Sequence, residues 1–237
     1  MPNSWFQFKQ FRINQERSAM KVGTDGVLLG AWTNLNGIKH IVDMGCGTGL
    51  VALMLAQRSK ARIDGIEINQ NAASQAAENF ASSPWPERLN SICGDIKQVC
   101  KLLEGEFDLA VCNPPFFPGH VKPPEENRSY ARHINANDWI LWFDAAFEMT
   151  TSTGKAVFIL PFENISERIK TADQSGFYPE AILNIRPKPG KEFKRCIVQF
   201  SKQKTEMIHH ELTIETGERG IYTDEFKTLV KDFYLKL

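Results

Sequence analysis

The sequence lacks several features that would assign it to a special class. It has no run of about 18 apolar residues, the length that a membrane-spanning helix needs, and residues 1–7 lack the basic start and apolar middle of a signal peptide. We therefore expect a cytoplasmic protein with no membrane partner. The five cysteines are scattered and form no Cys-x-x-Cys pair, which argues against a disulfide framework and against a metal site.

An excess of one charge is also absent, because 28 basic residues balance 28 acidic ones. The charges are nevertheless unevenly placed, since residues 186–204 contain seven basic residues and a single acid. Such a local patch can contact phosphates, although a solvated β-hairpin explains it equally well. The length permits one α/β domain with a filled core, but hardly two full domains. The chain shows no internal repeat.

A turn rich in glycine is the most informative feature that is present. A short apolar run reaches Asp43 and is followed by Gly45, Gly47 and Gly49, and residues 50–56 then form an apolar helix pattern. Glycines at such a turn permit positive φ and close approach of a ligand. The spacing is one residue tighter than the dinucleotide fingerprint, and the Asp43 carboxylate would repel a pyrophosphate. It suits a cationic ligand such as S-adenosylmethionine.

Two further predicted strands also end in acids. Residues 62–67 end at Glu67, and residues 91–95 end at Asp95. In a doubly wound sheet, an acid at the position of Glu67 can accept hydrogen bonds from both hydroxyls of a ribose. An acid at the position of Asp95 can accept one from the amine of an adenine. Each acid by itself is more often a helix cap or a solvated loop residue. Their succession after the glycine turn favours a ligand site.

The order of the elements predicts an α/β fold. Strands alternate with helices up to residue 160, which predicts a mostly parallel sheet with helices on both faces. Residues 181–185 and 196–200 are expected to add an antiparallel hairpin at the edge, giving seven strands in all. Residues 5–14 are predicted to form a strand or hairpin that caps one side.

The fourth strand of this sheet, residues 107–112, is followed by Asn113, Pro114, Pro115 and Phe116. The prolines fix φ and have no N–H, so the Asn113 amide oxygen and the Pro114 carbonyl can both point outward as acceptors. Two such acceptors match the two hydrogens of an amine on a conjugated ring, and Phe116 can stack on that ring. The alternative is a rigid loop with a structural Asn.

A polar loop precedes the glycine turn. It contains Lys21, Gly23, Thr24 and Asp25, and it is placed to line the same pocket. Residue types alone favour a simpler role, in which Thr24 and Asp25 cap a short helix over residues 27–32.

Together these motifs resemble those of class I S-adenosylmethionine-dependent methyltransferases that act on amino groups. Segments 20–32, 128–133, 221–226 and 231–235 are more specific, and they resemble the bacterial family of valine-tRNA adenine-N6 methyltransferases. That family modifies the adenosine just 3′ of the anticodon. The match covers essentially the whole chain, although many relatives have Tyr in place of Phe116.

The resemblance implies a Rossmann-like fold in which residues 1–237 form one methyltransferase domain. Residues 1–34 would form an N-terminal cap of strand, loop and helix, and residues 35–237 the core with a C-terminal helix. It further implies S-adenosylmethionine as cofactor, a tRNA substrate, no metal and a monomeric state. Methyl transfer would be a direct in-line displacement that forms S-adenosylhomocysteine.

The resemblance also implies roles for individual residues. Asp43 and the glycine backbone would hold the amino acid end of the cofactor, Glu67 its ribose and Asp95 its adenine. The full set of expected cofactor-binding residues is Lys21, Gly23, Thr24, Asp43, Gly45, Gly47, Gly49, Glu67 and Asp95. The expected catalytic residues are Asn113, Pro114, Pro115 and Phe116. The candidates for contacts with RNA phosphates are Lys122, Arg128, Arg132, Lys188, Lys191, Lys194 and Arg195.

Four other functions remain open at this point. An enzyme that methylates the glutamine amide of a protein release factor uses a similar Asn-Pro-Pro-aromatic loop. A methyltransferase acting on a base amine of ribosomal RNA is another possibility. A cofactor-binding scaffold without catalysis is the alternative outside the enzymes, and the intact Asn113 and Asp43 argue against it. A nicotinamide-dependent dehydrogenase fits least, because of the glycine spacing.

Overall fold

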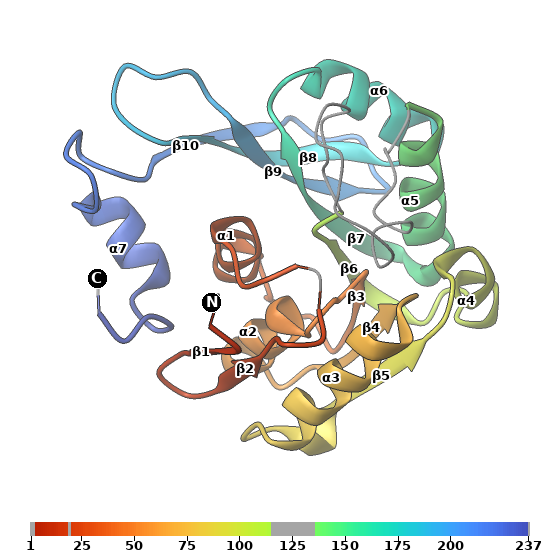
Figure 1. Cartoon of the computed structure of the whole chain (residues 1–237). Coiled ribbons are helices and arrows are strands. Elements are labelled where there is room, and N and C mark those ends of the chain that lie inside the picture. Colours follow the sequence, from red (N-terminus) through yellow and green to blue (C-terminus); the bar gives the residue numbers. More distant parts are fainter. Residues whose placement is uncertain (1–2, 19, 115–135, 237) are drawn as a thin grey trace.

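The apolar runs of the sequence form the strands of one large sheet, and the amphipathic segments between them form helices (Figure 1). The computed structural model describes residues 3–18, 20–114 and 136–236. The strands are β1 (Trp5–Gln7), β2 (Arg12–Asn14), β3 (His40–Met44), β4 (Arg62–Glu67), β5 (Leu89–Cys93), β6 (Phe107–Cys112), β7 (Thr150–Pro161), β8 (Tyr178–Arg186), β9 (Arg195–Ser201) and β10 (Ile208–Thr213). The helices are α1 (Thr24–Trp32), α2 (Leu50–Arg58), α3 (Gln70–Ala81), α4 (Ile96–Leu102), α5 (Ala136–Met149), α6 (Ile165–Gln174) and α7 (Asp224–Val230), with a 3₁₀ turn at Pro86–Arg88.

The large sheet has the strand order β10-β8-β9-β7-β6-β3-β4-β5. Strand β9 is antiparallel to both of its neighbours, and the other pairings are parallel. The predicted α/β fold, its mostly parallel sheet and the antiparallel β8–β9 pair are therefore confirmed. Strands β1 and β2 form a separate antiparallel hairpin, as residues 5–14 predict.

The edge of the sheet differs from the prediction. An eighth strand, β10, pairs with β8, so the β8–β9 hairpin does not form the edge. The sequence pattern of Ile208–Thr213 gives little sign of a strand, because its first four residues are exposed and only Leu212 is buried. Its pairing depends on the open row of N–H and C=O groups that β8 offers, which is a tertiary feature.

Helices cover both faces of the sheet (Figure 1). One apolar cluster contains residues of α1, α2, α3 and α7, and the other contains residues of α4, α5 and α6. The strands between them are buried on both sides, which is why their sequences are continuous apolar runs rather than alternating ones. Thr223 caps α7 by accepting the Phe226 N–H at 3.2 Å, as the sequence suggests.

The strand register brings the polar ends of the strands to one edge. Met44 pairs with both Ile66 of β4 and Cys112 of β6. The glycine turn after β3 therefore lies between Glu67 and Asn113, the residues at the ends of its two neighbours. Because all these strands run in parallel, their carboxyl ends lie at one edge, which is where a doubly wound sheet binds its ligands.

Helix α1 begins near the same edge of the sheet, and the contact made by its first turn differs from the predicted one. Its N-cap is Gly23, and neither Thr24 nor Asp25 caps it with a side chain, so the predicted cap is wrong. The Asp25 carboxylate instead forms an ion pair with Arg195 at 2.8 Å, 170 residues further along the chain. A distant guanidinium is a stronger partner for a carboxylate than a neighbouring N–H, and only the fold supplies it.

Gly49 is the glycine whose replacement should destabilise the fold most. Its φ is +83°, and a Cβ there would lie 2.3 Å from Cε1 of Phe80. We expect Gly49→Ala to lower the free energy of unfolding by about 2–5 kcal/mol, measured by urea denaturation. The matched control is Gly37→Ala, because Gly37 has φ +75° and open space around it. It should lose only about 1–2 kcal/mol. Equal losses would show that the Phe80 contact is unimportant.

Candidate functional site

The glycine turn connects β3 to α2, and its backbone requires glycine. Gly45, Gly47 and Gly49 have φ of +71°, +56° and +83°. L-residues rarely adopt such angles, so the prediction of positive φ at this turn is confirmed. A Cβ at Gly47 would meet no atom within 4 Å among the described residues, whereas one at Gly45 would lie 3.2 Å from the Trp142 ring. The turn is thus packed on one side and open at Gly47.

Asp43 lies beneath this turn. Its side chain is 1% exposed, and Oδ2 accepts the Ala52 N–H in the first turn of α2 at 3.0 Å. Burial raises the pKa of Asp43 to about 7; the Ala52 hydrogen bond lowers it, and the charge of Glu67 raises it further. The structure therefore shows Asp43 holding strand and helix together, and contact of its carboxylate with a ligand stays a prediction.

Glu67 supports the turn from the neighbouring strand. Its Oε2 accepts the Gly47 N–H at 3.0 Å, and its Oε1 accepts the Asn69 N–H at 2.9 Å. Each carboxylate oxygen has a second acceptor position, so these bonds leave capacity for the hydroxyls of a ribose. Glu67 thus lies beside the open position at Gly47, where the sequence predicts a cofactor.

Asp95 lies two residues beyond the end of its strand, whereas the sequence predicts it as the last residue of that strand. Strand β5 ends at Cys93, and Asp95 is the N-cap of α4, with Oδ1 accepting the Lys97 N–H at 3.0 Å. The strand begins and ends two residues earlier than the predicted residues 91–95, and the cap bond starts a helix at Asp95. A capping carboxylate keeps one oxygen for other partners, so its predicted contact with adenine is compatible with this geometry.

Asn113 follows β6 directly and lies between the glycine turn and α1. It is half-buried, Pro114 behind it is buried, and the Asn113 Nδ2 would lie 3.7 Å from a Cβ at Gly26. Gly26 therefore lets α1 pass close to this amide. The predicted residues Pro115, Phe116, Lys122, Arg128 and Arg132 lie outside the described residues.

The residues of the N-terminal loop that are predicted to contact the cofactor lie in an exposed stretch of the chain. Lys21, Gly23 and Thr24 are exposed, and the Lys21 ammonium donates to the Gln15 carbonyl. The side-chain oxygen of Gln15, which is 5% exposed, accepts the Val22 N–H at 2.7 Å. Gln15 thus positions this loop, and no motif in the sequence indicates that role.

A second buried amide attaches the N-terminal hairpin to the glycine turn. Asn79 of α3 exchanges two hydrogen bonds of 2.9 Å with the backbone of Asn14. Its Nδ2 also donates to the Thr48 carbonyl at 2.9 Å. Asn79 lies in an Ala-rich helix pattern, so sequence reasoning missed it. A buried amide with these donors and acceptors satisfied fixes the distance between the two segments.

The basic patch is less positive than its sequence suggests. Four of its cations have acid partners, and these pairs are Arg186 with Glu211, Lys188 with Glu215, Lys194 with Glu192, and Arg195 with Asp25. Such surface pairs are worth little in stability, but each acid reduces the attraction for a phosphate. Among the described residues, Lys191 forms no ion pair and is exposed. The predicted phosphate contacts remain predictions.

Two other kinds of site can be checked in the described part of the chain. Within residues 3–18, 20–114 and 136–236, no three His, Cys, Asp or Glu residues are grouped so that they could hold a metal ion. None of the helices in these ranges has the length and apolarity needed to cross a membrane.

Comparison with known proteins identifies the class of this fold and site. Residues 41–136 match the family model described as "Methyltransferase domain". A predicted O-methyltransferase from Agrobacterium tumefaciens aligns with 88% of this chain and 96% of its own, at 20% identity and a TM-score of 0.68. TYW2 from M. jannaschii, solved in complex with AdoMet, aligns with 83% of this chain and 84% of its own, at 16% identity and a TM-score of 0.58. These likenesses show that the chain has the Rossmann-like fold of methyltransferases.

Full-length relatives define the family within that class. The tRNA1(Val) (adenine(37)-N6)-methyltransferase of Trichodesmium erythraeum is 42% identical and covers 100% of both chains. The proteins of the same name from Flavobacterium psychrophilum and Yersinia pestis are 42% and 39% identical and cover 98% and 97% of this chain. The chain belongs to the tRNA1(Val) (adenine(37)-N6)-methyltransferase family.

The raised pKa of Asp43 gives a prediction about stability. The folded protein holds a proton at Asp43 up to pH about 7, whereas the unfolded chain releases it near the ordinary value of 3.8. This group therefore makes the free energy of unfolding fall as the pH rises between these two values. Asp43→Asn keeps an acceptor for the Ala52 N–H but cannot ionise. Its stability relative to wild type should rise across the same range by up to about 4 kcal/mol.

Urea denaturation of the cofactor-free protein at pH values between about 4 and 8 measures this difference. Above the folded pKa the difference should become constant. A difference that is the same at every pH would contradict the predicted protonation of Asp43.

Proposed function

We propose that this chain transfers the methyl group of S-adenosylmethionine to N6 of adenine 37 in valine tRNA. The observation that supports this most directly is the position of Asn113, which the strand register places beside the glycine turn in a chain that matches this family over its full length. We also propose that it acts as a monomer in the cytoplasm, where its tRNA substrate is found.

The residues of the turn suit the cofactor. The open position at Gly47 leaves room for a ligand against the backbone, and the Glu67 carboxylate beside it has acceptor positions for ribose hydroxyls. The buried Asp43 places an acid under the turn, and its ionised form attracts a cationic ligand rather than a pyrophosphate. When bound, S-adenosylmethionine supplies a methyl group that its sulfonium makes electrophilic.

The target amine would be held by Asn113 and the Pro114 carbonyl. Two acceptors on one nitrogen direct its lone pair out of conjugation with the ring and toward the methyl group. This arrangement requires no strong base, because the nitrogen becomes acidic only as it is alkylated. Pro115 would keep the loop rigid, and Phe116 would stack on the adenine.

An anticodon-loop adenosine is a suitable substrate on energetic grounds. Its base is already largely unpaired, so moving it into a pocket costs a few kcal/mol or less. A release-factor glutamine or a ribosomal RNA base would meet the same two acceptors. Incubation with labelled S-adenosylmethionine and, separately, valine tRNA, ribosomal RNA and release factor distinguishes these substrates, and label in tRNA is the expected result.

Replacement of Asn113 tests its role directly. Asn113→Ala should lower the rate of methyl transfer at least about 100-fold, because the amine loses one of two orienting acceptors. Affinity for S-adenosylhomocysteine, measured by calorimetry, should stay unchanged. The control is Asn90→Ala, since Asn90 forms its 2.8 Å bond to Asp64 where β5 begins, away from this edge. Lost cofactor affinity in Asn113→Ala would mean that the residue binds cofactor instead.

Charge reversal in the hairpin tests the RNA contacts. The double variant Lys191→Glu/Lys194→Glu should weaken tRNA binding and reduce the slope of log K against log salt by about 1 to 2. Lys60→Glu/Lys101→Glu changes the net charge equally at exposed positions where β4 begins and α4 ends. This control should bind tRNA as the wild type does. Similar salt slopes for both variants would exclude phosphate contacts at the hairpin.

A further inference from the structure

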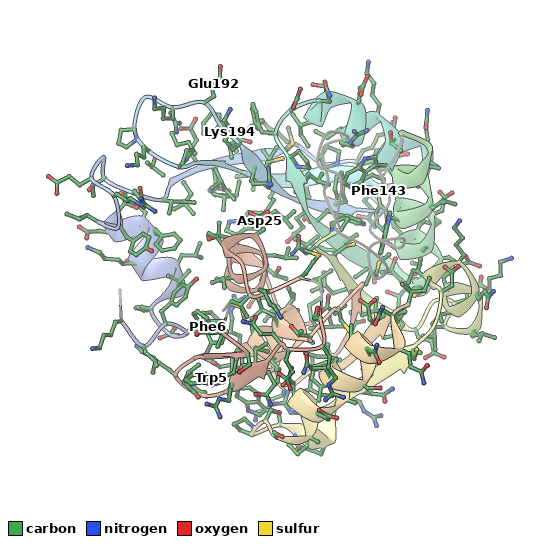
Figure 2. All side chains as sticks on the ribbon, in the orientation of Figure 1. Trp5, Phe6, Asp25, Phe143, Glu192 and Lys194 are labelled. Atoms are coloured by element: carbon green, nitrogen blue, oxygen red, sulfur yellow. The ribbon has the colours of Figure 1, made fainter. Side chains whose placement is uncertain are left out.

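Two aromatic rings lie at the mouth of a groove beside the catalytic edge. Phe162 follows β7 and Phe193 precedes β9, and their ring centroids are 5.2 Å apart at 49°. The groove has a volume of about 680 Å³. Its lining residues are Pro161, Phe162, Glu163, Glu192, Phe193, Lys194 and Arg195. Figure 2 shows two of them, Glu192 and Lys194, at the tip of the hairpin above α1 and Asp25.

Phe193 is not held in place by the core. It is half-buried but belongs to neither apolar cluster of the described residues, whereas Phe162 packs against the second cluster. The guanidinium of Arg186 also lies 4.1 Å from its ring centroid. An aromatic ring on a charged hairpin, outside both apolar clusters, adds little to the folding of the sheet. A binding role explains its presence better.

The groove lies close to Asn113. Strand register pairs Cys112 with Phe158 and Pro161 with Arg195, so Phe162 is about three residues beyond the level of Asn113. Three residues of strand span about 10 Å, which is roughly the rise of three stacked nucleotides. A nucleotide within about three positions of a target held at Asn113 can therefore reach the two rings.

The charges around the rings favour a nucleobase over a phosphate inside the groove. Glu163 and Glu192 line it together with Lys194 and Arg195, so its interior has no net positive charge. An adjacent hollow of about 420 Å³ is lined by Lys188, Lys191 and Lys194 and by one acid. Aromatic rings with a basic track beside them are typical of single-stranded RNA binding.

We propose that Phe162 and Phe193 form a stacking site for an unpaired base within about three positions of the target adenosine. Phosphates of the same strand would pass along Lys191 and Lys194. The site would bind the unpaired anticodon loop and would position the target for Asn113. This inference rests on the proposed RNA substrate.

Fluorescent tRNA tests stacking without any protein variant. Valine tRNAs are prepared with 2-aminopurine in place of one of the three nucleotides on either side of the target, and each is mixed with the full chain and S-adenosylhomocysteine. Stacking on an aromatic ring quenches this base. We expect quenching for at least one of these tRNAs. Binding without quenching at any of these positions would overturn the stacking site.

Variants of Phe193 separate stacking from simple apolar contact. Phe193→Ala and Phe193→Leu should both lose the quenching and raise KM for tRNA about 5- to 100-fold, with kcat unchanged. Phe193→Tyr should restore both. If Phe193→Leu behaves as the wild type, stacking is excluded. Phe193 belongs to neither apolar cluster of the described residues, so thermal unfolding of the three variants should lie close to that of the wild type.

Trp5→Ala is the matched control. The Trp5 ring is 44% exposed and has the guanidinium of Arg12 3.9 Å from its centroid, so it is also an exposed aromatic paired with arginine. It lies on β1, well away from the hairpin tip in Figure 2. Its KM should equal that of the wild type. An equal rise in KM for Trp5→Ala and Phe193→Ala would overturn the inference. No methylation of tRNA by the wild type would overturn the proposed function and this inference together.

Discussion

The Asp43 carboxylate accepts the Ala52 N–H from within the protein, and this bond ties the end of β3 to the start of α2. The chain between them must then reverse in a few residues, which only left-handed glycines permit. Glu67 accepts the N–H of Gly47 from the next strand and so closes the turn. Two acids and three positive-φ glycines thus set the backbone at the open position. The other functional groups are placed relative to it by the strand register.

The segment before the sheet depends on the same turn. Asn79 binds the backbone of Asn14 and the Thr48 carbonyl, so the N-terminal hairpin moves with the glycine turn. Gln15 then orients the loop that leads into α1. The ion pair of Asp25 with Arg195 continues this connection to the hairpin that precedes β9. The proposed cofactor side and the proposed RNA side of the site are therefore joined by direct polar contacts.

Some of these features follow from local chemistry. The glycine spacing and Asp43 indicated the turn, because left-handed backbone and a buried strand end leave recognisable residue types. The mostly parallel sheet followed from strand patterns that alternate with helix patterns along the chain. The interpretation of Asp25 as a cap was wrong because its best partner, Arg195, is close only in the folded chain.

Sequence alone determined the class of fold, the position of the turn and Asn113 as the residue beside it, since each depends on short stretches whose conformation neighbouring residues dictate. Only the tertiary structure decided the edge strand β10, the pairing of the basic hairpin with acids, and the meeting of Phe162 with Phe193. These features join residues from separate segments. Their energies depend on distances between side chains that the chain acquires only when the sheet has formed.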